Sequence, residues 1–475
     1  MQQKRPPVER NDDIILEINA LGAEGEGIGR MDGYAVFVPG VLPGERVAAH
    51  IIKANSGYGV GKLMEVLSPA QERVQPPCAI FEKCGGCTLQ HLDYPAQLLY
   101  KRKVVEDALT RLGGFKDIAV EHVTGMDEPW QYRNKGSFPV AMMDGRVQAG
   151  FFAPRSHRLV PTEDCLIQQE VGLLAMLAVR DWANEHGIPV YDEKTGKGFL
   201  RHVVTRTSIG GEVMVTIVAT SASVPEKQML IKTLRDRVEG LKSVYLNIQK
   251  EQTNVILGSD YRLLWGDKYI TETLLGLSFS ISPASFLQVN PVQTQKLYEK
   301  ALELLALKGT ERVVDAYCGI GTITLLLAKH AQEVIGIENV PEAVEDATRN
   351  ATKNGIENVS FLCAPAEEAL PKLVEDGVSV DALVLDPPRK GAEPAFLQAV
   401  IKSGVGRVVY VSCNPATLAR DCKILAEGGY KIEAVAPFDL FPQTAHVETI
   451  TMMTNCGRTK NNGVQPQDVV VLERK

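Results

Sequence analysis

Short apolar runs separated by glycine and proline fill the first part of the chain. Between Ile14 and Ser68 the runs IILEINALG, YAVFVPG, RVAAHIIKA and GVGKLMEVL alternate with turn-forming residues. Runs of this length bounded by Gly and Pro predict strands, and several in so short a segment predict a small five-stranded β-barrel. Barrels of this kind often bind oligonucleotides on one face, although a purely structural barrel would give the same pattern. We predict this barrel over residues 1–70.

The middle of the chain has a different texture. A helix is predicted over residues 94–112, because its apolar residues fall on one stripe and two glycines follow. Residues 120–275 read mainly as strands, with one helix near 168–186 and another near 225–238. These patterns predict a β-rich central domain over residues 71–280.

From about residue 281 apolar strands alternate with helices. The strand sequences are VVDAYC, EVIGIE, VSFLCA, DALVLD and RVVYVSC, and helical sequences such as PEAVEDATRNATKNG lie between them. This alternation is typical of a doubly wound, Rossmann-like α/β sheet. KIEAVAPF and HVETITMM lack an intervening helix and predict an antiparallel pair at the sheet edge. We predict that the α/β domain covers residues 281–456 and that residues 457–475 form a polar tail.

The composition is that of an ordinary globular protein. The chain has 475 residues, of which 45% are hydrophobic and 23% are charged. It contains no apolar run of membrane-spanning length, and its start, MQQKRPPVERNDD, lacks the apolar core of a secretory signal. We therefore expect a cytoplasmic monomer without a membrane partner. In that compartment nine cysteines indicate metal binding or catalysis more often than disulfides.

The charges are unevenly distributed. The net charge of −7 argues weakly against a nucleic-acid partner, but residues 131–160 carry five Lys or Arg and one acid, Asp144. The basic residues of this stretch and of the next basic run are Arg133, Lys135, Arg146, Arg155, Arg158, Lys194, Lys197, Arg201 and Arg206. The interleaved aromatic residues are Tyr132, Phe138, Phe151, Phe152 and His157. Such stretches suit phosphate contacts and base stacking, although a solvated strand face with its aromatic residues in the core would look the same.

Four cysteines are candidate metal ligands. Cys78, Cys84 and Cys87 form the pattern C-x5-C-x2-C, and Cys165 follows a β-rich segment. Four thiolates can hold a [4Fe–4S] cluster or a structural zinc ion. Zinc sites usually contain two short cysteine pairs, and only one is present here, so the pattern favours a closed, structural [4Fe–4S] cluster. The CGGC segment taken alone is also typical of a redox-active pair.

A nucleoside-binding pattern, DAYCGIGT, follows a predicted strand and opens a helix. Gly319 and Gly321 let the turn pass close to a bound nucleoside. Glu338 ends the next strand, where its carboxylate can bind both hydroxyls of a ribose. No third glycine stands at the dinucleotide spacing, so the pattern favours S-adenosylmethionine, which has no pyrophosphate, over NAD. A plain strand–helix turn with a surface Glu is the alternative.

Candidate chemistry lies at the carboxyl ends of the strands, where open α/β sheets bind ligands. Asp386 and Cys413 both end predicted strands, and Arg389 stands where an amino-group methyltransferase would have an aromatic residue. A thiol with a pKa near about 8.5 is a few per cent thiolate at neutral pH, which makes Cys413 a candidate nucleophile. Glu448 is the nearest candidate base, because partial burial raises the pKa of a carboxyl group. A surface glutamate on a strand is the alternative for Glu448.

Together these motifs resemble the RNA uracil-5-methyltransferases. FLQVN, DAYCGIGT, the Glu of GIEN, LDPPRKG, VSCNP and HVET follow one another as in that family. The predicted barrel is similar to its TRAM domain, and the four-cysteine pattern resembles the branch that acts on 23S ribosomal RNA. The resemblance covers residues 14–455.

The resemblance implies a role for each of these residues. Those that would hold S-adenosylmethionine are Gln288, Tyr317, Glu338 and Asp386. Cys413 would be the nucleophile and Glu448 the general base. Many relatives have Asn at the position of Thr322, so the contact made by Thr322 is left open.

The resemblance also implies the reaction. The protein would methylate C5 of uridine in 23S ribosomal RNA through a covalent bond between Cys413 and C6, with S-adenosyl-L-methionine and a [4Fe–4S] cluster as cofactors and RNA as the partner. Methylation of a uridine in the T-loop of transfer RNA is the alternative within the family. A non-catalytic iron–sulfur protein that binds RNA is the alternative outside it, and the presence of both Cys413 and Glu448 argues against that alternative.

Overall fold

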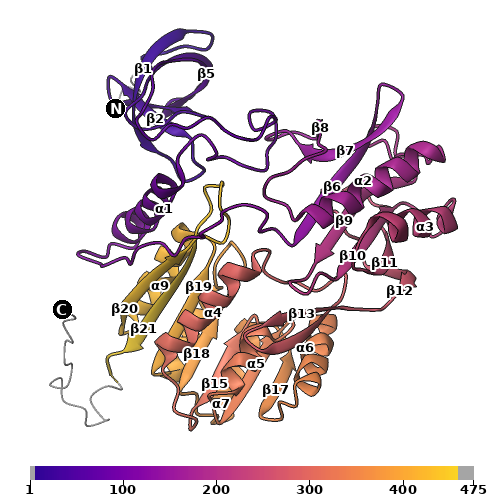
Figure 1. Ribbon diagram of the computed structural model, residues 1–475. Helices are drawn as coiled ribbons and strands as arrows, with labels where there is room; N and C mark the ends of the chain where they lie inside the picture. The colour runs from indigo at the N-terminus through magenta and orange to yellow at the C-terminus, as the bar shows by residue number, and fades with distance from the viewer. Residues whose placement is uncertain (1–5, 458–475) are drawn as a thin grey trace, which may run out of the picture. The chain divides into compact units, whose positions relative to one another are not determined.

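The computed structural model describes residues 6–457, which form two compact units (Figure 1). The first unit contains residues 6–104, 122–296 and 438–447, and the second contains residues 105–121, 297–437 and 448–457. Each unit is therefore assembled from segments that are distant in the sequence. The predicted polar tail lies outside the described residues from residue 458 onwards.

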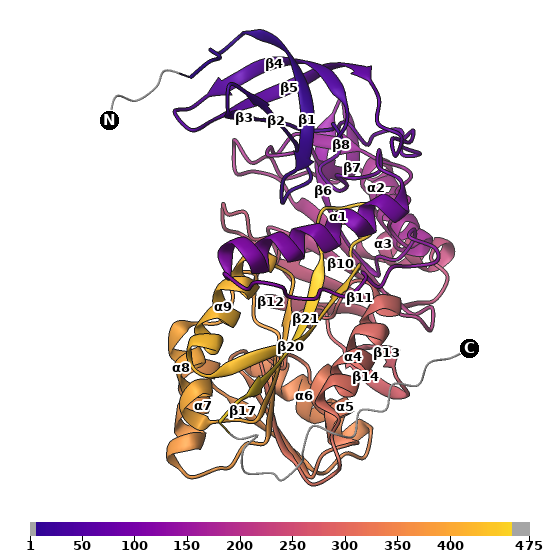
Figure 2. The same cartoon turned by 90° about the vertical axis from the view of Figure 1, so that its left-hand side faces the viewer.

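The first unit begins with a closed barrel of strand order β1-β2-β3-β5-β4 (Figure 2). Its strands are β1 (Asp13–Leu21), β2 (Gly27–Met31), β3 (Tyr34–Val38), β4 (Arg46–Ala54) and β5 (Tyr58–Ser68). Buried and less buried residues alternate along β3 and β4, as expected for strands with one face in a core. Gly29 lets β1 and β2 approach closely, because a Cβ there would lie 2.3 Å from Cγ of Leu16. The predicted five-stranded barrel is confirmed.

A long helix, α1 (Tyr94–Asp107), follows the cysteine-rich loop and continues into a π-helical turn, Ala108–Leu112. Within the first unit α1 holds the segment that precedes Glu448 in the chain. The buried Lys101 forms an ion pair with Asp439, and Tyr94 donates to the same carboxylate at 2.9 Å. Gln97 donates to Gln443 at 3.0 Å. The helix predicted over residues 94–112 is present, with a wider last turn.

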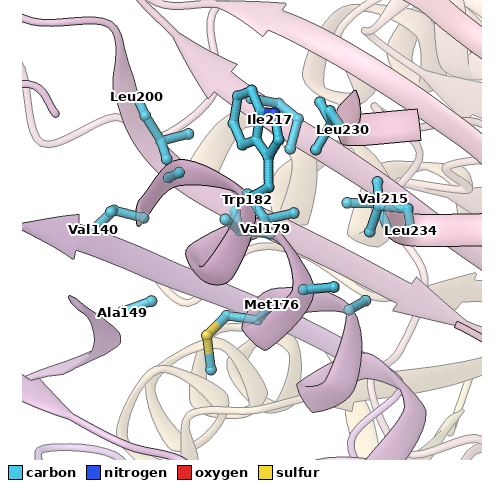
Figure 3. Packing of buried hydrophobic residues seen from close by; sticks show 14 of the residues in the cluster. Val140, Ala149, Met176, Val179, Trp182, Leu200, Val215, Ile217, Leu230 and Leu234 are labelled. Atoms are coloured by element: carbon cyan, nitrogen blue, oxygen red, sulfur yellow. The ribbon is translucent and has the colours of Figure 1, made fainter. Parts of the chain in front are cut away.

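The rest of the first unit is a sheet of strand order β12-β11-β10-β9-β6-β7-β8 and a hairpin, β13–β14. The sheet strands are β6 (Lys135–Met143), β7 (Arg146–Phe152), β8 (Leu159–Pro161), β9 (Leu200–Thr207), β10 (Val213–Ala219), β11 (Leu241–Ile248) and β12 (Asp260–Gly266). The hairpin strands are β13 (Ile270–Leu274) and β14 (Leu277–Ile281). The helices α2 (Glu170–Glu185) and α3 (Lys227–Arg237) pack on the sheet, and Trp182 of α2 lies among Ile217 and Leu230 in this core (Figure 3).

The second unit contains a sheet of strand order β17-β16-β15-β18-β19-β21-β20. Its strands are β15 (Arg312–Ala316), β16 (Glu333–Glu338), β17 (Val359–Cys363), β18 (Ala382–Leu385), β19 (Arg407–Ser412), β20 (Tyr430–Phe438) and β21 (Glu448–Asn455). The first five run parallel, and β21 runs antiparallel to β19. Since β21 lies between β19 and β20, its first six residues are buried, and β20 forms the edge.

Helices cover both faces of this sheet. They are α5 (Thr322–Ala328), α6 (Pro341–Lys353), α7 (Ala366–Glu375), α8 (Pro394–Ser403) and α9 (Pro415–Glu427), and α4 (Pro291–Leu305) leads into the unit. Figure 2 shows α7, α8 and α9 on one side and α5 and α6 on the other. The predicted fold class is confirmed: a Rossmann-like α/β sheet follows a small N-terminal barrel and a β-rich central region. None of the helices within residues 6–457 is both long and apolar enough to cross a membrane. The domain boundaries derived from the sequence stay predictions.

Candidate active site and cysteine cavity

The register of β19 and β21 brings the two predicted catalytic residues together. Val411 lies opposite Ile450, and Ser412 lies opposite Thr449. Extended by one residue beyond the end of β19, the same register sets Cys413 opposite Glu448, the first residue of β21. Opposite residues of an antiparallel pair project to the same face with their Cβ atoms about 5 Å apart. The pairing therefore places a thiol beside a carboxyl group, and the negative charge of Glu448 acts on the Cys413 thiol.

Glu448 is a buried carboxyl group rather than a surface acid. Its residue is 2% exposed, and its Oε1 atom has no hydrogen-bond partner. Burial raises the pKa of Glu448 well above the usual value, and the nearby negative charge of Asp386 raises it further, while Arg389 opposes both effects. A carboxyl group with a raised pKa can take up a proton near neutral pH.

The Cys413 thiol is less acidic than the sequence suggested. Burial raises its pKa to about 11, with further contributions from Glu448 and Asp386, and Arg389 lowers it. The expectation that a few per cent is thiolate at neutral pH is therefore wrong for the protein without ligands. Burial first, and then the two carboxylates, hold the proton on the sulfur, and neither is visible in the sequence. An added positive charge beside these carboxylates would favour the thiolate.

The loop that carries Arg389 is tied to the turn that carries Cys413. Asn414 follows Cys413, accepts a hydrogen bond from the N–H of Ala416 at 3.1 Å as the N-cap of α9, and donates to the carbonyl of Arg389 at 3.0 Å. Ala392, further along the loop that carries Arg389, donates its N–H to the buried carboxylate of Asp421 of α9 at 2.9 Å. Tyr410 of β19 donates to the same carboxylate at 2.7 Å. These bonds fix the distance between the thiol and the loop.

The nucleoside-binding turn has the geometry expected of DAYCGIGT. Gly319 adopts φ +56, and a Cβ there would meet nothing within 4 Å, so its open side faces free space. Glu338 ends β16, and its carboxylate accepts from the N–H of Gly319 at 3.1 Å and from the N–H of Val340 at 2.9 Å. Tyr317 adopts φ 65, and its ring lies 5.7 Å from that of Phe396. The structure thus joins the Gly turn to the end of the neighbouring strand through Glu338.

Two residues that the sequence did not single out lie next to this turn. Asp315 is buried beneath it, accepts from the Thr324 hydroxyl at 2.5 Å, and burial raises its pKa to about 7. Tyr298 is buried on α4, and its hydroxyl lies 3.1 Å from that of Thr322. Thr322, whose contact was left open, therefore has a partner within its own unit. A buried polar residue directly before the Gly turn was the signal for Asp315, whereas nothing in the sequence pointed to Tyr298.

Gln288 is the one residue among the predicted S-adenosylmethionine contacts that lies in the first unit. It is buried in the first unit, where its carbonyl accepts from Asn134 at 3.3 Å. Tyr317, Glu338, Asp386, Cys413 and Glu448 all belong to the second unit. The role of Gln288 stays a prediction.

The four predicted metal ligands line one cavity of about 350 Å³ in the first unit. Three of them come from the loop before α1, and Cys165 comes from the turn before α2. Gly85 holds this loop to the sheet by donating to the carbonyl of Phe152 at 3.0 Å. Burial raises the pKa of Cys87 to about 12 and that of Cys165 to about 11, and mutual repulsion among the thiols adds to both shifts. Within residues 6–457 no group of three or more His, Cys, Asp or Glu side chains is arranged to hold a metal ion.

Comparisons with known proteins agree with this geometry. A family model described as tRNA (Uracil-5-)-methyltransferase matches residues 207–456, and a TRAM-domain model matches residues 8–64. This chain belongs to the RNA uracil-5-methyltransferase family. An uncharacterized RNA methyltransferase of Clostridium tetani is 45% identical over 96% of this chain and 100% of its own. One from Halalkalibacterium halodurans is 45% identical over 95% and 99%.

A solved structure of a family member is also similar. The crystal structure of Pyrococcus abyssi tRNA (uracil-54, C5)-methyltransferase in complex with S-adenosyl-L-homocysteine has a TM-score of 0.75 and 28% identity, over 93% of this chain and 100% of that one. The RNA uracil-5-methyltransferases are S-adenosylmethionine-dependent enzymes, and the predicted enzyme class and TRAM domain are confirmed.

The expected RNA-binding face of this methyltransferase is smaller than its sequence suggested. Tyr132 and Phe138 are 3% and 0% exposed and belong to the core, so they cannot stack on bases. Arg201 and Arg206 are 5% exposed each and bind backbone carbonyls instead of phosphates. The residues of the basic runs that are exposed are Arg146, Arg155, Arg158, Lys194 and Lys197. Half-buried Phe152 stacks on the exposed His157 with 5.0 Å between ring centroids, so one aromatic surface remains beside these cations.

Proposed function

We propose that this protein methylates C5 of uridine in RNA through a transient covalent bond between Cys413 and C6 of the base. The observation that supports this most strongly is the register of β19 and β21, which sets the Cys413 thiol beside the buried Glu448. A nucleophile adjacent to a base with a raised pKa, at the carboxyl end of a strand, is the arrangement that this chemistry needs.

The charges around the turn fit S-adenosylmethionine. Four carboxyl groups (Asp315, Glu338, Asp386 and Glu448) and one guanidinium, that of Arg389, interact electrostatically here. Such an excess of carboxylates suits a sulfonium cation better than a nucleotide phosphate. Tyr317, Glu338, Asp386 and Gln288 would hold S-adenosylmethionine, which supplies an electrophilic methyl group.

The residues of this chain would act in a fixed order. Cys413 gives its proton to solvent and bonds as the thiolate to C6 of uracil, so that the electron pair of the C5–C6 double bond moves toward C5 and O4. C5 then takes the methyl group, and the carbon–sulfur bond of the sulfonium breaks with its electron pair on sulfur. Glu448 takes the remaining C5 proton, the double bond forms again, and the bond from C6 to Cys413 breaks to release the thiolate. Every electron pair stays within these groups.

The pKa values explain why Cys413 would need bound S-adenosylmethionine before it can react. Without ligands the pKa of Cys413 is about 11 because of burial and the carboxylates around it. A bound sulfonium adds a positive charge beside those carboxylates and lowers the pKa of both Cys413 and Glu448. Methyl transfer removes that charge, so Glu448 becomes a stronger base at the step in which it accepts the C5 proton.

We further propose that the cysteine cavity holds a [4Fe–4S] cluster through Cys78, Cys84, Cys87 and Cys165. A single zinc ion needs its four sulfur atoms roughly 3.8 Å apart, given Zn–S distances of about 2.3 Å, and no group within residues 6–457 is set for a metal ion. A cavity of about 350 Å³ is instead roomy enough for a multi-iron cluster. The cluster would supply structural cross-linking between the loop before α1 and the turn before α2, and no step of methyl transfer passes through it.

As the substrate we propose 23S ribosomal RNA, and transfer RNA is the second candidate. The four-cysteine pattern together with the barrel supports ribosomal RNA. The Pyrococcus abyssi enzyme, which acts on uridine 54 of transfer RNA, supports the alternative. In either RNA the target base must leave its stack, which costs a few kcal/mol and least in a loop.

Transcripts of both RNAs test this proposal. The purified protein and methyl-labelled S-adenosylmethionine are incubated with unmodified 23S ribosomal RNA or transfer RNA, and the label is identified after nuclease digestion. We expect 5-methyluridine in the ribosomal transcript. Label in transfer RNA alone would support the second candidate, and label in neither would contradict the proposed reaction.

A further inference from the structure

Three cations lie at or next to the cysteine cavity without a carboxylate partner. Arg133 and Lys135 line the cavity together with the four cysteines. Lys135 lies directly opposite Arg206 in the antiparallel pairing of β6 and β9, so both side chains project to the same face of the sheet. Within residues 6–457 none of the three forms an ion pair with an acid, and repulsion by Arg206 and Arg133 acts on Lys135.

The protein groups around these cations do not neutralise them. Arg206 is buried, donates to the carbonyl of Ser285, and has an Nε atom without a partner. Glu272 lines a small cavity with Arg206, but its carboxylate accepts from the backbone N–H groups of Ile209 and Thr273. Asp164 is the one acid among the residues that line the cysteine cavity. Like charges opposite each other in a sheet destabilise it, and a buried cation needs an anion.

We propose that Lys135, with Arg206 behind it, is the residue that balances the negative charge of a thiolate-held iron–sulfur cluster in this cavity. The inference rests on the cluster of the proposed function. Four thiolates outweigh the positive charge of an iron–sulfur core, so the ligated cluster is an anion. Its cysteines and Lys135 share one cavity. Lys135 is half-buried in a cavity lined by the four cysteines, so RNA phosphates are a poorer source of the anion than those sulfur ligands.

A positive charge in the same cavity as the cluster has a measurable consequence. One-electron reduction adds one negative charge to the cluster, and a neighbouring ammonium group stabilises the reduced form more than the oxidised form. Lys135 therefore raises the reduction potential of the cluster and slows loss of iron. Both effects depend on the charge rather than on the length of the side chain.

The test compares Lys135→Met with Lys135→Arg and Lys242→Met in protein purified without oxygen. Lys242 lies on β11 of the same sheet, outside the cavity, 3.8 Å from Glu212, and serves as the matched control. Optical and spin-resonance titration with dithionite gives the midpoint potential, and a chelator gives the rate of iron loss. We expect Lys135→Met to shift the ratio of reduced to oxidised cluster at least tenfold toward oxidised, or about 59 mV for one electron. Lys135→Arg and Lys242→Met should stay near wild type.

The outcomes separate this inference from the proposal on which it rests. A wild-type protein without iron and sulfide would refute the cluster itself. A wild-type cluster whose potential and iron loss are the same in Lys135→Met would refute the role of Lys135 alone. If Lys135→Met does not fold by circular dichroism, Lys135→Gln is measured in the same titration, and an unchanged potential there would equally refute it.

Discussion

The strand-end site of the second unit and the cysteine cavity of the first unit have opposite charges. At the strand end, the carboxyl groups of Asp386 and Glu448 outweigh the single cation Arg389. In the cavity, Arg133 and Lys135 outweigh one acid before any thiol loses its proton. The strand-end site therefore favours binding of a cation, and the cysteine cavity favours binding of an anion.

This difference teaches how the same residue type acquires two roles. Burial raises the pKa of Cys413 to about 11 and that of Cys87 to about 12. In the proposed reaction, burial and the carboxylates at the strand end would keep Cys413 protonated until a sulfonium binds, so that it would be a nucleophile only in the complex. In the cavity the cations would favour the thiolates that hold the proposed cluster.

Replacing the nucleophile should have the largest effect. Cys413→Ser removes the group that makes C5 reactive, so methylation should fall at least about a thousandfold. Labelled methyl transfer to RNA measures the rate, and filter binding should show unchanged RNA affinity. Cys363→Ser, at an exposed cysteine at the end of β17, is the control and should keep full activity. Turnover by Cys413→Ser above that limit would show that Cys413 is not the nucleophile.

Glu448→Gln should slow the reaction about 10² to 10⁴-fold at a later step, because only removal of the C5 proton is impaired. Methylated RNA should then remain bonded to Cys413 and appear as a slower band in a denaturing gel. Glu433→Gln, at the neighbouring edge strand β20, changes an exposed carboxylate and should leave no such band. A variant that is slow but never accumulates the bonded species would remove Glu448 from this step.

Removing one of the predicted cluster ligands should release iron from the cysteine cavity and destabilise the protein. Cys165→Ser should abolish most of the bound iron and lower the free energy of unfolding by at least about 3 kcal/mol, since ligand binding contributes to folding stability. Iron analysis and urea denaturation measure both quantities. Cys456→Ser, at an exposed cysteine, should change neither. Equal iron contents in the two variants would mean that Cys165 is no ligand.

The rate of Cys413 alkylation should report the raised pKa of its thiol. With a pKa of about 11, its thiolate fraction rises about tenfold for each pH unit between pH 7 and 10. The rate of modification by iodoacetamide, followed at this residue by mass spectrometry, should rise in the same way without reaching a plateau. S-adenosylmethionine should increase the rate at pH 8, whereas S-adenosylhomocysteine, whose sulfur carries no charge, should not. A plateau near pH 8.5 in the free protein would show an ordinary thiol.

The smallest effect is expected from the support of the strand-end loop. Tyr410→Phe removes the hydroxyl that donates to the buried Asp421 at 2.7 Å. Asp421 keeps its bond from Ala392, so the free energy of unfolding should fall by about 1 kcal/mol. Urea denaturation measures the change. A loss of several kcal/mol would mean that this bond holds the whole loop rather than contributing to it.

The sequence predicted the strand-end site better than its electrostatics. Alternation of strands and helices places Asp386 and Cys413 at the carboxyl ends of strands, and the HVET strand lies beside Cys413 because it has no helix before it. The register that pairs Cys413 with Glu448 depends on β21 running between β19 and β20, which no local pattern specifies. The pKa of Cys413 depends on its burial and on side chains that are distant in the sequence, so the sequence did not predict it.

The cavity and the basic runs were predicted less well, because their surroundings also depend on contacts between residues that are distant in the sequence. The cysteine spacing indicated a shared site, and the four side chains do line one cavity. Alternating basic and aromatic residues looked like a nucleic-acid face, but strand alternation turns Phe138 into the core and Arg206 onto the opposite, covered face. Only the folded sheet shows that Lys135 and Arg206 stand opposite each other.

The central claim is the bond between the sulfur of Cys413 and C6 of uracil, and RNA containing 5-fluorouridine tests it most directly. Fluorine at C5 leaves no proton for Glu448 to remove, so the bonded species should accumulate with S-adenosylmethionine present. Nuclease and protease digestion followed by mass spectrometry should then give a peptide in which a methylated fluorouridine is attached to Cys413. Attachment at a different residue, or no attachment in protein that methylates normal RNA, would contradict the account.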